Sequence, residues 1–208
     1  GLIATSDHST IEQSYTLGVV KGSGTFMACG GLIGSINYGN VNNCYSLARV
    51  EGGSNVGGLI GKNDYARLFY CFAGGDVTRR ASYNCRAGGL VGLSCYGSAS
   101  NCFATGDVVA ETTYGGSDTV VSTTAGRLFG ETGVYGTSSE TSTVNCYGSG
   151  NRSAIDNHDS SYPNYCTVEI YENVSTLKSK VFLRYTLVYN EEIWNITDGE
   201  YPKLCWQN

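Results

Sequence analysis

A short sequence unit recurs through most of this chain, and it constrains the fold more than any other feature. The unit opens with Gly-Leu-hydrophobic-Gly, as in residues 31–34, and closes with Asn-Cys-aromatic, as in residues 43–45. The interval from the Leu to the Cys position is 12 residues in four copies and 18 in a fifth, whereas successive Leu positions lie 30, 27, 31 and 38 residues apart. A constant interval with connectors of variable length is typical of stacked coils, whose strands must keep register while their loops vary.

The residues between these landmarks have the composition of short β-strands. An aromatic and a small residue follow each Cys, and a short run then ends in Val50, Val77 or Val108. β-Branched and aromatic residues bounded by Gly, Asn and Asp indicate strands, and residues 1–150 show no helical periodicity. We therefore expect an all-β, parallel β-solenoid (β-helix) of about five coils over residues 1–150, with right-handed winding favoured by parallel crossovers.

One unit alone cannot bury its own apolar side, so stacking is expected to place Leu on Leu and Cys on Cys. The Gly residues on both sides of each Leu-hydrophobic pair predict tight corners, which need either a positive φ or a close approach of backbones. A buried thiol behaves as a small apolar group, so we expect the Cys ladder to be chemically inert. The predicted structural ladders are Leu32, Leu59, Leu90 and Leu128, and Cys44, Cys71, Cys102 and Cys146. Leu2 and Ser14 are the corresponding residues of an N-terminal copy.

The chain has 9 Cys, and those outside the ladder are candidates for disulfides. If the compartment is oxidising, Cys85 is expected to pair with Cys95, and Cys166 with Cys205, although spacing alone does not determine connectivity. No Cys-x-x-Cys pair occurs, which argues against a zinc ribbon or a thioredoxin-type site.

From about residue 151 the repeat stops, and residues 151–208 are expected to form a C-terminal capping segment. Ser175 is positioned to cap a short helix over residues 176–183, with Leu177 and Val181 on one face. A cap over the open end of a solenoid would protect unpaired strand edges. Trp194 and Trp206 are the candidate ligand contacts, as a platform for sugar rings, but an aromatic cluster within the cap is the preferred interpretation.

Composition and charge argue against several function classes. The net charge is −5, and the one adjacent basic pair, Arg79-Arg80, is expected in a solvated loop, so nucleic acid is not an expected partner. No apolar stretch approaches the length of a membrane-spanning helix.

No catalytic motif is apparent, and we expect no enzyme activity, cofactor or metal. The chain has two His, and neither a His-Glu-x-x-His nor a Gly-x-Ser-x-Gly sequence occurs. His158 stands near two Asp residues in a Ser-rich segment, where a solvated loop is the more ordinary interpretation than a cation site. Asp76 and Asp107 recur at one repeat position and would stack; paired carboxylates suit acid–base work or Ca²⁺, but Gly-Asp is also common turn chemistry.

The repeat resembles the GLUG motif, named for its Gly-Leu-hydrophobic-Gly sequence, and the later Asn-Cys-Tyr and Gly-Asp-Val parts fit equally well. The segment Trp194 to Leu204 is similar to the closing Trp … Asp-Gly-x-Tyr-Pro-x-Leu sequence that often follows such repeats. Ala4 and Ser14 in the first copy depart from the pattern. The resemblance implies an architecture found in bacterial surface proteins, including adhesins and the stalks of immunoglobulin A proteases.

These observations favour an extracellular or cell-surface, adhesin-like interaction protein whose partner is a protein or a glycan. Two alternatives remain open: a carbohydrate-active β-helix enzyme (a polysaccharide lyase or glycosidase), and a filament subunit that associates end to end. The stretched fifth unit, about residues 132–143, is a candidate binding loop.

Overall fold

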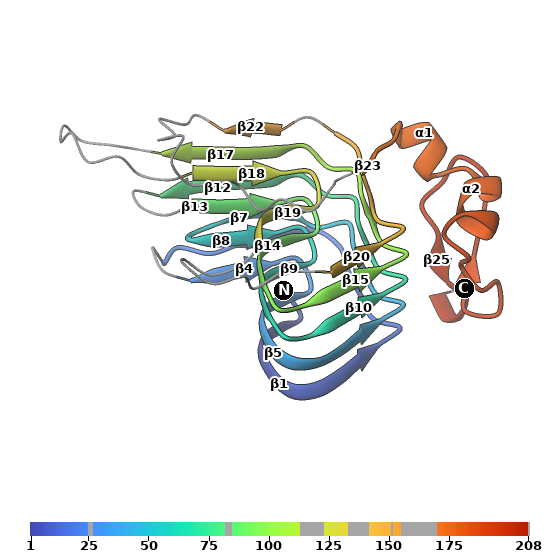
Figure 1. The fold of residues 1–208 in the computed structure, drawn as a ribbon, viewed down its shortest axis with the longest axis horizontal. Helices are drawn as coiled ribbons and strands as arrows, with labels where there is room; N and C mark the ends of the chain where they lie inside the picture. Colours follow the sequence, from blue (N-terminus) through green and yellow to red (C-terminus); the bar gives the residue numbers. More distant parts are fainter. Residues whose placement is uncertain are drawn as a thin grey trace.

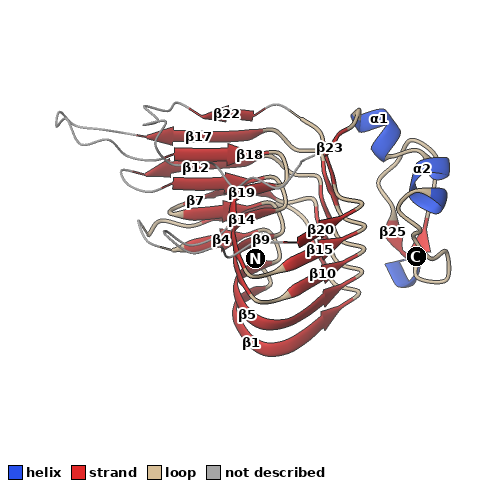
Figure 2. Cartoon of the chain, viewed as in Figure 1, coloured by secondary structure: helices blue, strands red, loops and turns tan. Residues whose placement is uncertain are grey.

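The computed structural model describes residues 1–24, 27–81, 85–112, 123–132, 142–150, 152–154 and 170–207. The chain is all-β apart from short C-terminal helices, and its strands stack in parallel to form a solenoid (Figures 1 and 2). The predicted parallel β-solenoid is therefore confirmed.

Four sheets, here called A to D, run along the solenoid. Sheet A contains β1 (Ile3–Glu12), β5 (Ile33–Asn42), β9 (Ile60–Asp64), β14 (Val91–Cys95) and β19 (Phe129–Thr132), together with β10 (Arg67–Phe69), β15 (Ser98–Ser100) and β20 (Ser142–Val144). Sheet B contains β2 (Tyr15–Thr16), β6 (Tyr45–Ser46), β11 (Phe72–Ala73), β16 (Phe103–Ala104), β21 (Tyr147–Gly148) and β23 (Ile170–Tyr171). Sheet C contains β3 (Val19–Lys21), β7 (Arg49–Gly52), β12 (Val77–Ala81), β17 (Val108–Thr112) and β22 (Arg152–Ala154). Sheet D contains β4 (Ala28–Gly30), β8 (Asn55–Gly57), β13 (Cys85–Gly88) and β18 (Thr123–Gly126).

The coils begin with β1, β5, β9, β14 and β19. Four of them contribute to every sheet, and the fifth contributes to three within the described residues. The expected count of about five is therefore slightly too high for complete coils. The solenoid pairing also continues past the expected boundary at residue 150, because β22 pairs with β17 and β23 pairs with β21.

The strand register explains the 12-residue interval. Ile33 pairs with Ile60, and Val91 pairs with both Ile60 and Phe129, so equivalent residues of successive repeats lie directly above one another. The interval spans the two arms of sheet A, which have the same length in each of the first four coils. All eight predicted Leu and Cys ladder residues lie in the buried interior cluster, as do the residues that follow each Leu.

The Gly corners depend on close backbone approach rather than on positive φ. A Cβ added at Gly58 would overlap the carbonyl oxygen of Gly89 in the next coil, and one at Gly61 would lie 2.6 Å from the amide nitrogen of Cys29. Neither Gly has a positive φ. Because the coils touch backbone to backbone here, no side chain fits between them.

The C-terminal segment, residues 170–207, lies along the side of the stack and is here called the strap. After β23 it contains α1 (Val174–Leu177), α2 (Lys180–Tyr185), β24 (Trp194–Asn195), β25 (Lys203–Leu204) and the 3₁₀ turn η1 (Cys205–Gln207). Figure 1 shows α1, α2 and β25 beside the solenoid rather than across its top or bottom. The expectation that this segment caps an open end is therefore not met.

The strap covers an outward-facing aromatic ladder on sheet B, with at least one ring contact at each of the five levels. The ring centroids are separated by 5.6 Å (Trp206 to Tyr15), 6.0 Å (Trp194 to Tyr45), 5.8 Å (Tyr201 to Phe72), 6.2 Å (Tyr189 to Phe103) and 5.0 Å (Phe182 to Tyr147). Apart from the exposed Trp206, these rings belong to a hydrophobic cluster separate from the solenoid interior.

The helix prediction holds only in part. Two short helices replace the expected single one, and the capping side chain is Ser179, whose hydroxyl oxygen accepts the Phe182 amide at 3.2 Å. Leu177 and Leu183 are buried, whereas Val181 is exposed.

The pair Arg79-Arg80 lies in strand β12, not in a solvated loop. Arg79 is fully buried, and its Nε donates to the carbonyl oxygen of Gly53 at 2.7 Å. Burial, with a smaller effect from the charge of Arg86, lowers the pKa of Arg79 to about 10. The side chain of Arg80 points to solvent.

Candidate functional site

Four aromatic side chains form an exposed ladder where the two arms of sheet A meet. They are His8, Tyr38, Tyr65 and Tyr96, here called the aromatic ridge. Adjacent ring centroids lie 4.8, 4.7 and 4.7 Å apart, and the rings are nearly parallel. The three Tyr side chains are 41–43% exposed. One residue from each of the first four coils thus contributes to a continuous aromatic surface.

The backbone at every ridge position is left-handed, with φ between 48° and 62°. The next corner of each coil, between sheets A and B, has the same conformation, but three of its five residues are Asn: Asn43, Asn101 and Asn145. Asn tolerates this region far better than a bulky side chain does. The ridge therefore places aromatic residues where the backbone favours Gly or Asn.

Two carboxylates beside the ridge, those of Asp7 and Asp64, are paired with neighbouring side chains. The carboxylate of Asp7 lies 3.0 Å from Nδ1 of His8 and accepts a hydrogen bond from the Asn37 amide at 2.8 Å. The hydrogen bond from His8 has the largest effect and, with that from Asn37, lowers the pKa of Asp7. Asp64 pairs with Lys62.

The phenol of Tyr65 remains protonated under physiological conditions. Desolvation raises its pKa, and the neighbouring phenols of Tyr38 and Tyr96 and the carboxylate of Asp64 add to the effect. The Tyr65 hydroxyl can therefore both donate and accept hydrogen bonds.

The Cys ladder has a structural role that its hydrogen bonds explain. Each ladder thiol points to the carbonyl oxygen of the residue two positions earlier, at 3.2 Å in Cys44, Cys71 and Cys102 and 3.4 Å in Cys146. In the first coil Ser14 takes this place, and its hydroxyl makes the same bond to Glu12 at 2.8 Å. Burial raises the pKa values of Cys71 and Cys102 well above the ordinary range. Cys71 and Cys102 are therefore neutral thiols, and each ladder thiol adds a second hydrogen bond to a corner carbonyl that also accepts a backbone amide.

Among the described residues, one Cys of each expected disulfide is a free thiol. Cys95 and Cys205 both carry thiols. Cys95 is buried, and desolvation followed by the charge of Asp64 raises its pKa to about 11. The Cys205 thiol points to the carbonyl oxygen of Glu191 at 3.5 Å. The side chain of Cys85 and all of Cys166 lie outside the described residues.

The two Trp residues differ in their access to a ligand. Trp194 is 0% exposed, and its Nε1 donates to Oδ1 of Asn43 at 3.0 Å, so it fastens the strap to the solenoid. The structure therefore does not support Trp194 as a ligand contact. Trp206 is exposed and packs at a tilt against Tyr15.

The recurring Asp pair forms a turn ladder. Both side chains are exposed, and Oδ1 of Asp76 accepts the backbone amide of Asp107 at 3.0 Å. No group of three or more metal-ligating side chains is found in the part of the chain that the structure describes. His158 and most of the expected binding loop at residues 132–143 lie outside that part.

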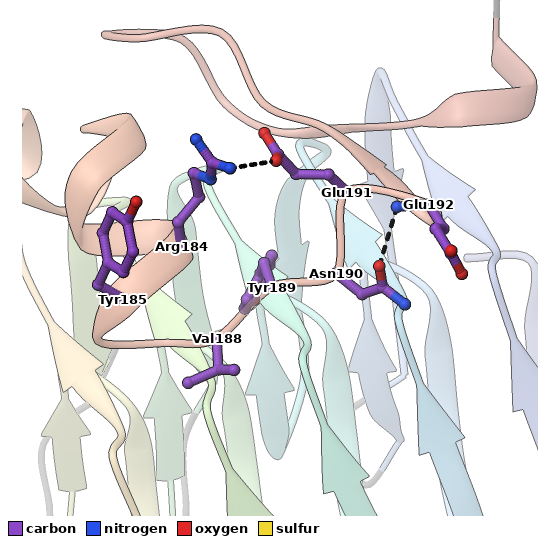
Figure 3. Close-up of a pocket in the computed structure, with 7 residues that line it drawn as sticks. All are labelled: Arg184, Tyr185, Val188, Tyr189, Asn190, Glu191 and Glu192. Atoms are coloured by element: carbon purple, nitrogen blue, oxygen red, sulfur yellow. Dashed lines mark hydrogen bonds and ion pairs between the residues drawn. The ribbon is translucent and has the colours of Figure 1, made fainter.

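A shallow depression on the strap, with a volume of about 610 Å³, lies beside α2 (Figure 3). Arg184 and Glu191 form an ion pair of 2.7 Å across it, and Tyr185 and Val188 flank it. The described helices include none that is long and apolar enough to span a membrane.

The aromatic ridge was missed by the sequence reasoning, although a signal was present. Each ridge residue follows its repeat Leu by six positions: His8 follows Leu2, Tyr38 follows Leu32, Tyr65 follows Leu59 and Tyr96 follows Leu90. The interval is as regular as the one that identified the Cys ladder.

Comparison with known proteins supports the architecture. The model of the GLUG motif matches residues 52–78 and 83–109, which lie mainly in the third and fourth coils. The chain is also similar to the crystal structure of a proposed immunoglobulin A1 protease from Bacteroides ovatus, with a TM-score of 0.66 and 21% sequence identity. The alignment covers 96% of this chain but 58% of that one, and identity this low establishes a shared fold only.

Among curated proteins, none has a sequence that matches this chain. The repeat intervals, the strand register and the family model agree: the chain is a parallel β-solenoid in which residues 52–78 and 83–109 match the GLUG motif.

Proposed function

We propose that the chain is a non-catalytic, adhesin-like interaction module that acts outside the cell or at its surface. The observation that carries this proposal is the aromatic ridge, a rigid and exposed row of rings on an otherwise structural stack. Tyr supplies a large amphipathic contact surface at low cost in conformational entropy, which is why binding loops are rich in it. Stacking between coils holds these rings in place before any partner arrives.

The GLUG repeats support an extracellular location, because the resemblance is to bacterial surface proteins. The immunoglobulin A1 protease activity proposed for the Bacteroides ovatus protein is not extended to this chain, which spans 58% of that one. The Asp76–Asp107 pair does not favour the enzyme alternative, since the Asp76 carboxylate is engaged with a backbone amide.

The test is binding and turnover measured on the same purified chain. We expect the immobilised chain to retain a glycan or an extracellular host protein, and to leave immunoglobulin A1 and acidic or plant polysaccharides uncleaved. Cleavage of any of these, abolished by Asp76→Asn or Asp107→Asn, would replace this proposal with the enzyme alternative. Failure to bind any glycan or protein would also contradict it.

End-to-end association is a second candidate. The first coil exposes large apolar side chains, namely Leu2, Leu17, Val19 and Met27. A second copy stacked on this coil would cover them. Sedimentation that shows only monomer over a wide concentration range would exclude the filament alternative for this chain.

A further inference from the structure

Fold stability alone does not explain the aromatic ridge. A left-handed backbone is unfavourable for a non-Gly residue, and the ridge contains four such residues. Stacking between adjacent rings is only a modest favourable contribution. The neighbouring corner meets the same backbone requirement with Asn in three of its five coils, and Nδ2 of Asn145 donates to Oδ1 of Asn101 at 3.2 Å. The aromatic residues of the ridge thus make the fold less stable than Asn would at the same positions. Residues in unfavourable backbone conformations often lie at functional sites.

The ridge exposes hydroxyl groups and ring edges rather than ring faces. Neighbouring rings lie 4.7 Å apart at 15° and 6°, so each inner face is covered by the next ring. The phenol oxygens of Tyr38, Tyr65 and Tyr96 make no hydrogen bond to other residues in the described ranges. A ligand therefore meets a row of unengaged hydroxyls at a spacing of one coil.

The covered ladder on sheet B shows what a polypeptide partner requires. Its third and fourth rungs are Phe72 and Phe103, both fully buried beneath the strap. The other three rungs are Tyr, and the hydroxyl of Tyr45 is matched by Gln207 at 3.0 Å or less. The fully covered Phe rungs are thus apolar, whereas the ridge carries a hydroxyl on three successive rungs and suits a hydrated, hydrogen-bonding partner.

The exposed area of the ridge also favours a small hydrogen-bonding partner over a protein. Three Tyr side chains, each about two-fifths exposed, present on the order of 300 Å², whereas a stable protein interface takes about 800 Å² from each partner. An oligosaccharide a few units long fits the smaller area. Arg67, two residues beyond Tyr65, is exposed and could receive a sugar carboxylate.

We propose that the aromatic ridge binds an oligosaccharide laid along the solenoid axis, through hydrogen bonds between sugar hydroxyls and the phenols of Tyr38, Tyr65 and Tyr96. This inference rests on the proposed binding function and names its ligand class. Neutral and carboxylated sugars both carry hydroxyl groups that could bond the phenols, and the experiment below distinguishes these two kinds of sugar.

The probe is an array of neutral tri- to pentasaccharides and their sialylated counterparts, with deglycosylated extracellular proteins as a third set. The main variant replaces Tyr38, Tyr65 and Tyr96 with Asn, the residue already used at the matching corner. A second variant replaces the same three with Phe, which keeps the stack and removes the hydroxyls. Tyr185→Asn is the matched control, because Tyr185 is an exposed Tyr on α2, outside the ridge.

We expect the chain to bind at least one sugar, both ridge variants to bind it more than tenfold more weakly, and the control to be unchanged. Loss of sialylated but not neutral binding in Arg67→Gln would identify the carboxylated source. Sugar binding that survives in both ridge variants would overturn the inference but leave the proposed function intact. If the chain binds a deglycosylated protein but no sugar, the inference is also overturned and the proposed function again stands. If the chain binds neither a sugar nor a protein, both the inference and the proposed function are contradicted.

Discussion

Replacing Leu59 with Ala should be among the most damaging single changes in this chain. Leu59 is fully buried between Leu32 and Leu90 in the interior ladder. Its carbonyl oxygen accepts the Leu32 amide and its amide donates to Leu90, both at 2.9 Å. These bonds hold the coils at a fixed separation, so the walls of the resulting cavity cannot close.

A Leu to Ala change at an unyielding site costs about 3–5 kcal/mol. With a urea m-value of about 2 kcal/mol/M, the midpoint of unfolding should fall by about 2 M. Circular dichroism at increasing urea concentration measures this midpoint directly.

The chain offers a matched control at the same repeat position. Leu2 directly precedes Ile3, which pairs with Ile33, but it is 61% exposed, so Leu2→Ala should cost less than about 1 kcal/mol. Equal midpoints for the two variants would refute the reasoning, since the cost would then not come from an interior packed between fixed coils.

Two further predictions concern the thiols and the strap. Cys71 and Cys102 should resist a thiol reagent until the protein unfolds. The free energy of unfolding should also fall as the pH rises above 9.0, the pKa of these thiols in the unfolded chain. Above that pH the unfolded chain loses the thiol protons, whereas the raised pKa values keep the folded protein protonated. Rapid labelling at neutral pH, or a urea midpoint unchanged at alkaline pH, would contradict this. Trp194→Ala should cost about 3–5 kcal/mol and expose the strap to protease, because it empties a buried site and removes the donor to Asn43. Trp194→Phe should be milder, and equal protection from cleavage in the wild-type and Ala chains would show that the strap is held elsewhere.

The interior of the solenoid was predictable from the sequence because identical levels require identical residues. The interval from Leu to Cys therefore reports the length of sheet A directly. The same regularity extends to the ridge through the interval from Leu59 to Tyr65, but an exposed Tyr carries no burial signal that would set it apart.

The position of the strap could not be read in the same way. The aromatic residues of the strap predict an aromatic cluster, but the sequence does not determine whether that cluster covers an end or a side of the solenoid. The deciding feature is the outward-facing ladder that includes Phe72 and Phe103, whose direction depends on the strand register. Arg79 was misjudged for a related reason: its charge suggested solvent, whereas its alternation within β12 places it inside.

The strap also changes how the solenoid should come apart. In a repeat array each coil contacts only its neighbours, so such arrays can fray one unit at a time from an end. Here Trp206 contacts the first coil and Phe182 contacts the fifth, within one short segment. An end coil cannot detach without breaking its strap contact, and release of the strap exposes all five levels at once. Unfolding should therefore be closer to a single cooperative transition than to a stepwise loss of coils.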